Sequence, residues 1–149
     1  MAGSRRPGTQ RRKAEARLAL AARRVLAWEG AGRARVDVTL LDARAMRRAN
    51  RRATGRRGLT DVIAYALPQP DGTLLGDVYL CVAAADGWVA AAAADASHAR
   101  RLDEELVRLA VHGTLHVLGY DHPVGAGRTR SAMWRRQERY VRRLLRRRR

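Results

Sequence analysis

The segment between residues 112 and 122 places the strongest constraint on how this 149-residue chain can fold. His112 and His116 are four residues apart, so on a helix both imidazoles leave the same face about one turn apart. Gly119 can end that helix in a sharp reversal, because glycine tolerates the left-handed backbone of many helix ends. His122 follows three residues later. The segment therefore predicts a helix, a sharp turn and three converging imidazoles.

This histidine spacing is typical of a metal site. The chain has four histidines, and three of them fall within these eleven residues. Ordinary core or surface histidines are expected to be scattered instead. Three neutral imidazoles favour zinc and leave a fourth coordination position open to water, as in catalytic zinc sites. We therefore expect His112, His116 and His122 to bind one Zn²⁺ per chain.

The hydrophobic pattern of the remaining chain predicts an α+β fold. Residues 36–40 alternate as an edge strand does, whereas 62–67 and 77–82 are continuous apolar runs typical of central strands. The turn Gln69-Pro-Asp-Gly72 between those runs reads as a hairpin-like connection. Helical periodicity is found at residues 13–28, 43–53, 83–96, 103–117 and near the end of the chain. We expect a small mixed β-sheet of about four strands packed with about five α-helices, with the metal site on a helix and the loop after it.

Three single residues add detail to this fold. Asp42 is placed to cap the N-terminus of the second helix. The single cysteine, Cys81, cannot form an internal disulfide, and its apolar neighbours predict a buried strand position. His98 lies in a polar stretch outside the metal pattern and is expected at the surface.

Length and composition indicate one globular domain. Hydrophobic residues make up 46% and charged residues 30% of the chain, and no internal repeat or interdomain linker is visible. We expect a flexible basic arm at 1–12, a single domain at 13–145 and a basic tail at 146–149. No apolar run approaches the roughly 20 residues that span a bilayer, and no hydrophobic signal-peptide core is visible. A cytoplasmic protein without membrane association is the expectation.

The positive charge is distributed unevenly. The formal net charge is +17, and residues 128–149 carry eleven arginines against the single acid Glu138. Residues 1–13 add five basic groups and no acid, whereas residues 58–127 carry three arginines against nine acids. Such polarisation suits a polyanion such as nucleic acid. Terminal arginine runs can also be merely solvated.

The second expected helix has a strongly basic face. Its arginines recur at helical spacing with no acid among them, whereas a merely solvated face usually mixes both signs. Two more arginines follow in the next loop. The candidate RNA-binding residues are Arg44, Arg47, Arg48, Arg51, Arg52, Arg56 and Arg57.

Metzincin proteases share the spacing H-x-x-x-H-x-x-G-x-x-H. In those enzymes a glutamate follows the first histidine and acts as the general base. Here that position is Gly113. Without the carboxylate the peptide-hydrolysis mechanism lacks its proton acceptor, so a metallopeptidase is the less favoured alternative.

The histidine segment closely resembles the signature of the YbeY family of bacterial endoribonucleases. The resemblance extends to Thr60-Asp-Val-Ile-Ala-Tyr65, which is similar to the family block T-[DN]-V-[LI]-S-F, and to Leu75-Gly-Asp-Val-Tyr-Leu-Cys81, which is similar to L-G-D-I-x-I-C. It covers roughly residues 36–145. Asn50, Glu105, Met133 and Glu138 also fit.

The chain departs from the family pattern at three places. Leu59 stands where the family usually has proline, and Ala64-Tyr65 stands where it has Ser-Phe. Thr54 stands at the register where many members carry a functional arginine. No arginine can therefore be carried over by position, although Arg51, Arg52, Arg56 and Arg57 are near enough to substitute.

The resemblance implies a zinc-dependent endoribonuclease that is specific for single strands, matures the 3′ end of 16S rRNA and acts in ribosome quality control. Its partners would be rRNA, precursors of the small ribosomal subunit and ribosomal proteins. Zinc lowers the pKa of its water toward about 7 and polarises a phosphoryl oxygen. His112 and Asp121 are the catalytic candidates, and Asp121 either orients an imidazole or caps the loop. The main alternative is a non-catalytic, rRNA-binding assembly factor with structural zinc.

Overall fold

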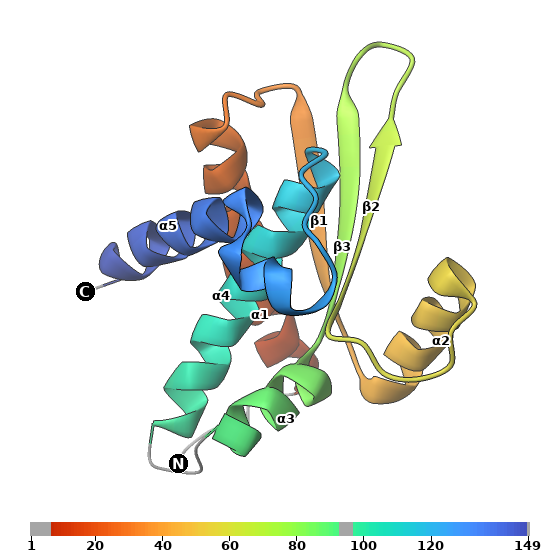
Figure 1. The fold of residues 1–149 in the computed structure, drawn as a ribbon, viewed down its shortest axis with the longest axis vertical. Coiled ribbons are helices and arrows are strands. Elements are labelled where there is room, and N and C mark those ends of the chain that lie inside the picture. The colour runs from red at the N-terminus through yellow and green to blue at the C-terminus, as the bar shows by residue number, and fades with distance from the viewer. Residues whose placement is uncertain (1–6, 93–96, 149) are drawn as a thin grey trace.

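The computed structural model describes residues 7–92 and 97–148, and it shows a small sheet flanked by helices (Figure 1). Its helices are α1 (Pro7–Trp28), α2 (Ala43–Thr54), α3 (Val82–Ala92), α4 (His98–Val117), the 3-10 helix η1 (Gly125–Arg130) and α5 (Ala132–Arg146). Its strands are β1 (Ala34–Leu41), β2 (Val62–Pro68) and β3 (Leu74–Cys81). The α+β class is confirmed. The sheet has three strands rather than about four, because each extended apolar run forms one strand and the other apolar segments described are helical.

The central strand of the sheet is β3. It pairs in parallel with β1 and antiparallel with β2, so that Val78 lies between Val38 and Ala64. The Gly72 N–H donates to the Gln69 carbonyl oxygen at 3.0 Å, which closes the turn from β2 to β3. The hairpin and the edge position of β1 predicted from the sequence are both confirmed.

Strand β2 lies at the other edge, so its expected central position is wrong. Ile63 near its start is buried, whereas Tyr65 and Leu67 further along are exposed. Met46 of α2 packs with Ile63, and Figure 1 shows the β2–β3 hairpin extending well past α2. An apolar run in the sequence looks the same whether helices cover the strand along its whole length or, as here, only near its start.

The two faces of the sheet are covered by different helices. One face joins the main core with α1 and α4, whereas the other forms a smaller cluster in which Met46 of α2 meets Ile63 and Cys81. The sheet residues in the main core include Val38, Leu40, Val78 and Leu80. Cys81 is fully buried, as expected, and Asp42 caps α2 by accepting from the Ala45 N–H at 2.7 Å. Helix α2 therefore lies across the sheet from α4 (Figure 1).

Two glycines allow α4 to lie unusually close to β3. A Cβ atom on Gly113 would stand 2.6 Å from Val78 Cγ1, and one on Gly76 would stand 2.5 Å from Val117 Cγ1. Neither position has room for a side chain without displacing its neighbour. Because Gly113 and Val117 face the sheet, the residues just before them, His112 and His116, lie on the adjacent flank of the helix.

Two helices begin earlier than the sequence predicted. Helix α1 begins at Pro7 rather than Lys13, so residues 7–12 of the expected basic arm are helical. Proline suits the first position of a helix, a signal that is independent of apolar periodicity. Helix α4 begins at His98 rather than near Asp103, and the His98 Nε2 atom lies 2.6 Å from an Asp86 carboxylate oxygen.

The remaining parts of the expected arm, third helix and tail, at residues 1–6, 93–96 and 149, lie outside the described residues. Among the helices in the described part of the chain, none combines the length and apolar character needed to cross a membrane.

Candidate metal centre

Three imidazoles converge where α4 ends. His112 and His116 project from its last two turns, and Gly119 reverses the chain with a φ of 95°. The loop that follows brings His122 back toward the two histidines of α4. The Nε2 atoms of His112 and His116 are 3.0 Å apart, and each lies 3.3 Å from the His122 Nε2 atom. The reversal and the convergence predicted from the histidine spacing are both present.

The opposite nitrogen of each ring contacts a carbonyl oxygen. His112 Nδ1 lies 2.6 Å from the Gln137 side-chain oxygen, His116 Nδ1 lies 3.0 Å from the Tyr120 carbonyl and His122 Nδ1 lies 2.9 Å from the Pro123 carbonyl. A carbonyl oxygen only accepts, so each Nδ1 must carry the proton and donate. Each Nε2 atom then presents a lone pair toward the other two.

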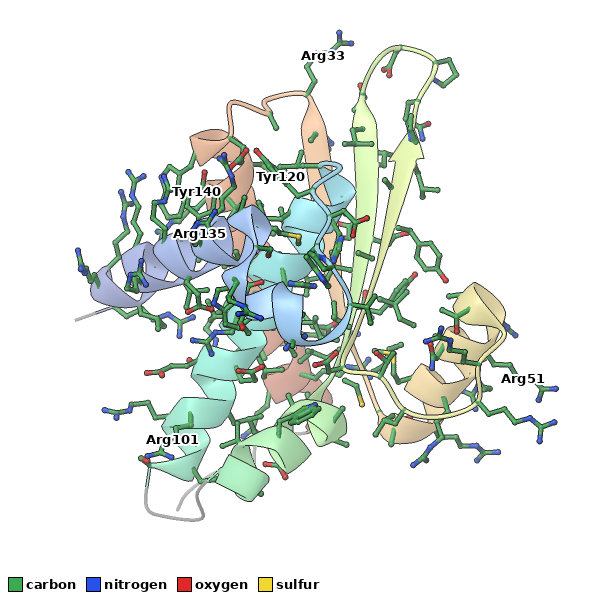
Figure 2. All side chains as sticks on the ribbon, viewed as in Figure 1. Arg33, Arg51, Arg101, Tyr120, Arg135 and Tyr140 are labelled. Atoms are coloured by element: carbon green, nitrogen blue, oxygen red, sulfur yellow. The ribbon has the colours of Figure 1, made fainter. Side chains whose placement is uncertain are left out.

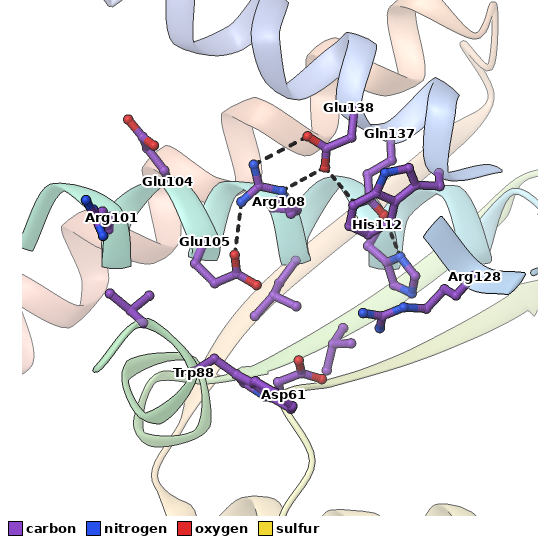
Figure 3. Close-up of a pocket in the computed structure, with 14 residues that line it drawn as sticks. Asp61, Trp88, Arg101, Glu104, Glu105, Arg108, His112, Arg128, Gln137 and Glu138 are labelled. Carbon is purple, nitrogen blue, oxygen red and sulfur yellow. Dashed lines mark hydrogen bonds and ion pairs between the residues drawn. The ribbon is translucent and has the colours of Figure 1, made fainter. Parts of the chain in front are cut away.

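A chain of polar contacts holds Gln137 in this orientation. Its side-chain nitrogen donates to Glu138 Oε1 at 3.2 Å, which turns the amide oxygen toward His112 (Figure 3). Glu138 is itself held by Arg108, whose Nε atom donates at 2.7 Å, and Arg108 also pairs with Glu105 at 3.0 Å. Gln137 is only 1% exposed and the other members of the network are partly buried, so His112 is oriented by contacts that reach from α4 to α5.

The loop that carries His122 is tied to the end of α1. Tyr120, whose carbonyl accepts from His116, donates its hydroxyl to Glu29 at 2.7 Å. Tyr140 and Arg136 of α5 also donate to Glu29, at 2.5 and 2.9 Å. Burial raises the pKa of Glu29, but the hydrogen bonds from Tyr140, Tyr120 and Arg136 outweigh it and the pKa is lowered. The loop is therefore fastened by a carboxylate that stays ionised at neutral pH.

The surroundings of His112 and His116 favour their neutral form. The pKa of His112 is lowered to about 4, mainly by burial; the hydrogen bond to Gln137 opposes this shift, whereas the neighbouring histidines and Arg128 add to it. Burial also lowers the pKa of His116. Neutral imidazole is the form that binds metal ions, so no proton has to leave these two rings at cellular pH.

This donor set fits a metal ion. Three lone pairs that face one another at 3.0 to 3.3 Å repel unless a cation lies between them. Tetrahedral zinc, with bonds of about 2.0–2.1 Å, places its nitrogen ligands about 3.3–3.4 Å apart. His112, His116 and His122 therefore form a cluster that can hold a metal ion.

Gly113 occupies the position of the metzincin glutamate, and it faces the sheet. A side chain there would collide with Val78, and its first atom would also come within 3.4 Å of Val62. The glutamate that metzincin peptidases use as a general base is absent at this position, and the packing against β3 leaves no room for its side chain.

Asp121 contacts the loop backbone. Its carboxylate accepts from the His122 N–H at 2.8 Å, whereas the three Nδ1 atoms contact the oxygens of Gln137, Tyr120 and Pro123. Of the two roles considered for Asp121, the contacts thus favour capping of the loop.

The seven candidate RNA-binding arginines lie apart from the histidines. All are exposed, and five of them stand on α2, which lies across the sheet from α4; Figure 2 shows Arg51 pointing away from the body of the protein. Thr54, at the register of the usual family arginine, ends α2 by donating to the Asn50 carbonyl at 2.9 Å. The seven are Arg44, Arg47, Arg48, Arg51, Arg52, Arg56 and Arg57.

A pocket of about 480 Å³ opens beside His112, and none of those seven arginines is among its described lining residues. It is bounded by α3, α4, α5, η1 and the start of β2. The arginine that lines it nearest the histidines is Arg128 of η1, which lies next to His112 in Figure 3. Arg128 also lies over the ring of Trp134, 5.7 Å from its centroid.

Sequence reasoning missed Gln137, Tyr120, Glu29 and Arg128. Gln137 and Glu29 are separated from the residues they hold by 25 and 91 positions, and no local spacing indicates such a pairing. Arg128 is six positions after His122, but in the sequence it is one of eleven arginines between residues 128 and 149, and nothing local distinguishes it from the others.

The fold and the site define a small α+β protein with three histidines arranged for metal binding on a helix and the following loop. The family model described as Endoribonuclease YbeY matches residues 8–145. The chain therefore belongs to the YbeY family, which confirms the resemblance seen in the sequence.

Several relatives named Endoribonuclease YbeY are similar to this chain. The protein of Mycolicibacterium gilvum is 38% identical over 100 residues, which is 60% of this chain and 53% of the relative. The Moorella thermoacetica protein is 40% identical over 108 residues, 65% of each chain, and that of an Anaeromyxobacter is 36% identical over 123 residues, 81% of this chain and 61% of the relative. The chain thus spans between half and two thirds of the length of these relatives.

A solved structure shows the same fold. The solution structure of TM1509 from Thermotoga maritima superposes with a TM-score of 0.57 at 22% identity, covering 96% of this chain and 86% of that one.

Proposed function

We propose that this protein is a zinc-dependent, single-strand-specific endoribonuclease that acts in rRNA processing, including maturation of the 16S rRNA 3′ end, and in ribosome quality control. The observation that carries the proposal is the convergence of three Nε2 atoms within 3.3 Å, each on a ring whose other nitrogen is engaged. Relatives of the same family carry the name endoribonuclease, which supports the reaction class.

The metal would be held by His112, His116 and His122. Zinc bound there supplies a water of lowered pKa and a Lewis acid for a phosphoryl oxygen. The chain's own groups do the rest: Gln137 and the Tyr120 and Pro123 carbonyls hold the imidazoles, and Arg128 offsets negative charge on a phosphate beside His112. Arg128 thus takes the electrostatic role for which the sequence suggested Arg51, Arg52, Arg56 or Arg57.

The exposed arginines of α2 would hold RNA outside the reacting phosphodiester. They lie across the sheet from the histidines, so they suit a longer RNA or a ribosomal precursor that wraps around the domain. Binding of this kind is salt-dependent and largely independent of sequence. The proposed partners are rRNA, small-subunit precursors and ribosomal proteins, and the proposed place of action is the cytoplasm.

The loop contacts favour an enzyme over an assembly factor with structural zinc. A structural zinc ion supplies the contacts that hold its own ligands together. Here Tyr120 is fastened to Glu29, and the His122 N–H is bound by Asp121, so protein groups already hold the loop. The metal is therefore not needed to hold the loop in place, which suits a catalytic role.

His116→Ala distinguishes the two functions. The enzyme predicts a folded protein, by circular dichroism and thermal unfolding, that no longer cleaves a labelled single-stranded RNA. Structural zinc predicts that the variant unfolds. His98→Ala is the matched control, because His98 pairs with Asp86 outside the metal centre, and it should retain cleavage. A folded His116→Ala variant with full activity would refute the proposal.

A further inference from the structure

The pocket beside His112 is large enough to hold more of an RNA substrate than the reacting phosphate. Its volume of about 480 Å³ lies in the range of sites that enclose small organic molecules. It runs from His112 and Arg128 at one end, along α4, to Glu104 and Arg101 at the other (Figure 3). A nucleotide whose phosphate lies at the histidines therefore has room to place its base further along the pocket.

The charge of the pocket differs from that of the whole protein. Its described lining contains four carboxylates and three arginines, on a chain with a formal charge of +17. Arg108 in the middle is paired with Glu138 at 2.7 Å and with Glu105 at 3.0 Å. Away from Arg128, the described lining has four carboxylates against Arg101 and Arg108, so this part of the pocket disfavours a phosphate and suits an uncharged base.

Two side chains on the wall opposite α4 have the chemistry to bind a base. Trp88 of α3 is 68% exposed and lines the pocket, so the ring has a face available for stacking. Asp61, just before β2, is half-buried in the same wall, and no hydrogen bond to its carboxylate is found among the described residues. Single-stranded RNA is commonly bound by aromatic rings that stack on unpaired bases and by polar groups that contact base edges.

We propose that Trp88 and Asp61 form a subsite for one unpaired RNA base next to the phosphate held at the metal centre. Trp88 stacks on the base, and the Asp61 carboxylate accepts a hydrogen bond from an exocyclic amino group. Cytosine, adenine and guanine offer such a group, whereas the single N–H of the uracil edge is flanked by two carbonyl oxygens that repel a carboxylate. The subsite rests on the proposed RNA function, and it would give the enzyme both its requirement for single strands and a bias against uridine.

Binding and cleavage are measured separately on the zinc-loaded protein. The probes are fluorescein-labelled hexacytidylate and hexauridylate, with affinity from fluorescence anisotropy and cleavage from gel analysis. The wild type should bind the cytidine probe more tightly. Trp88→Ala should weaken that binding roughly tenfold, the usual scale for one stacked base, and Trp88→Phe should largely restore it. Asp61→Asn should reduce the difference between the two probes, because an amide can also donate to uracil.

The control is Tyr65→Ala, which removes another exposed ring that does not line the pocket. It should bind both probes as the wild type does. Wild-type affinities for both probes in Trp88→Ala and Asp61→Asn would overturn the subsite, whatever the cleavage result. Base-selective binding without cleavage of either probe or of a longer mixed-sequence RNA would support the subsite and refute the nuclease proposal.

Discussion

Gln137 controls the orientation of His112, and replacing it tests how the metal centre is built. Gln137→Met keeps a side chain of similar length in this buried position but removes the oxygen that accepts from the His112 Nδ1–H at 2.6 Å. The imidazole N–H is then left without its partner, and the ring loses the contact that directs its Nε2 atom toward His116 and His122.

The expected loss can be estimated from both effects. A buried donor without an acceptor costs about 1–3 kcal/mol of folding stability. Loss of a group that orients a metal-binding histidine typically weakens metal affinity 10- to 100-fold, or about 1.4–2.7 kcal/mol. Zinc affinity is measured at pH 7 by competition with a chromophoric chelator, and stability by urea unfolding of the metal-free protein.

Val141→Ala is the matched control, because Val141 is also buried on α5 but belongs to the hydrophobic core. It should lower stability and leave zinc affinity within about twofold of the wild type, since none of the groups that orient the histidines changes. A folded Gln137→Met variant that binds zinc as tightly as the wild type would refute the role assigned to Gln137.

Three further predictions concern the packing of α4, the loop anchor and the basic helix. Gly76→Ala should cost about 1–3 kcal/mol in urea unfolding, because its Cβ would lie 2.5 Å from a Val117 methyl; a change under about 0.5 kcal/mol would contradict the close approach. Glu29 has a lowered pKa when folded, so its contribution to stability is present above the ordinary value of 4.5 and is lost as pH falls through the lowered value. Glu29→Gln should therefore be less stable than the wild type at pH 7, and unfolding curves down to pH 3 should show this gap closing; a constant gap would argue against an ionised anchor. Replacing Arg47 and Arg51 by alanine should reduce the slope of log affinity against log salt for single-stranded RNA by about 1.4, and an unchanged slope would remove α2 from the RNA-binding surface.

The metal ligands could be predicted from the sequence because their geometry is local. His112 and His116 are one helical turn apart, and Gly119 marks the reversal that returns His122. The capping of α2 by Asp42 and the hairpin at Gly72 were equally local. Each of these predictions depended on fewer than a dozen consecutive residues.

The parts that could not be predicted depend on contacts between distant segments. The anchor that Glu29 provides for Tyr120 joins residues 91 positions apart, and the pocket brings Asp61, Trp88 and Arg128 together from three distant parts of the chain. The basic face of α2 was visible in the sequence, but its position across the sheet from the histidines was not. The apolar run of β2 suggested a central strand because hydrophobicity does not reveal where neighbouring helices end.

The proposed function depends on a metal held by His112, His116 and His122, and one preparation can test it directly. Zinc content and cleavage of single-stranded RNA are measured before treatment with a chelator, after it, and after zinc is added back. We predict about one zinc per chain, loss of cleavage with the metal, recovery on zinc addition and a circular dichroism spectrum that does not change. Zinc-loaded protein that cleaves no RNA would favour the assembly factor, and full ribonuclease activity in the metal-free protein would contradict the proposal.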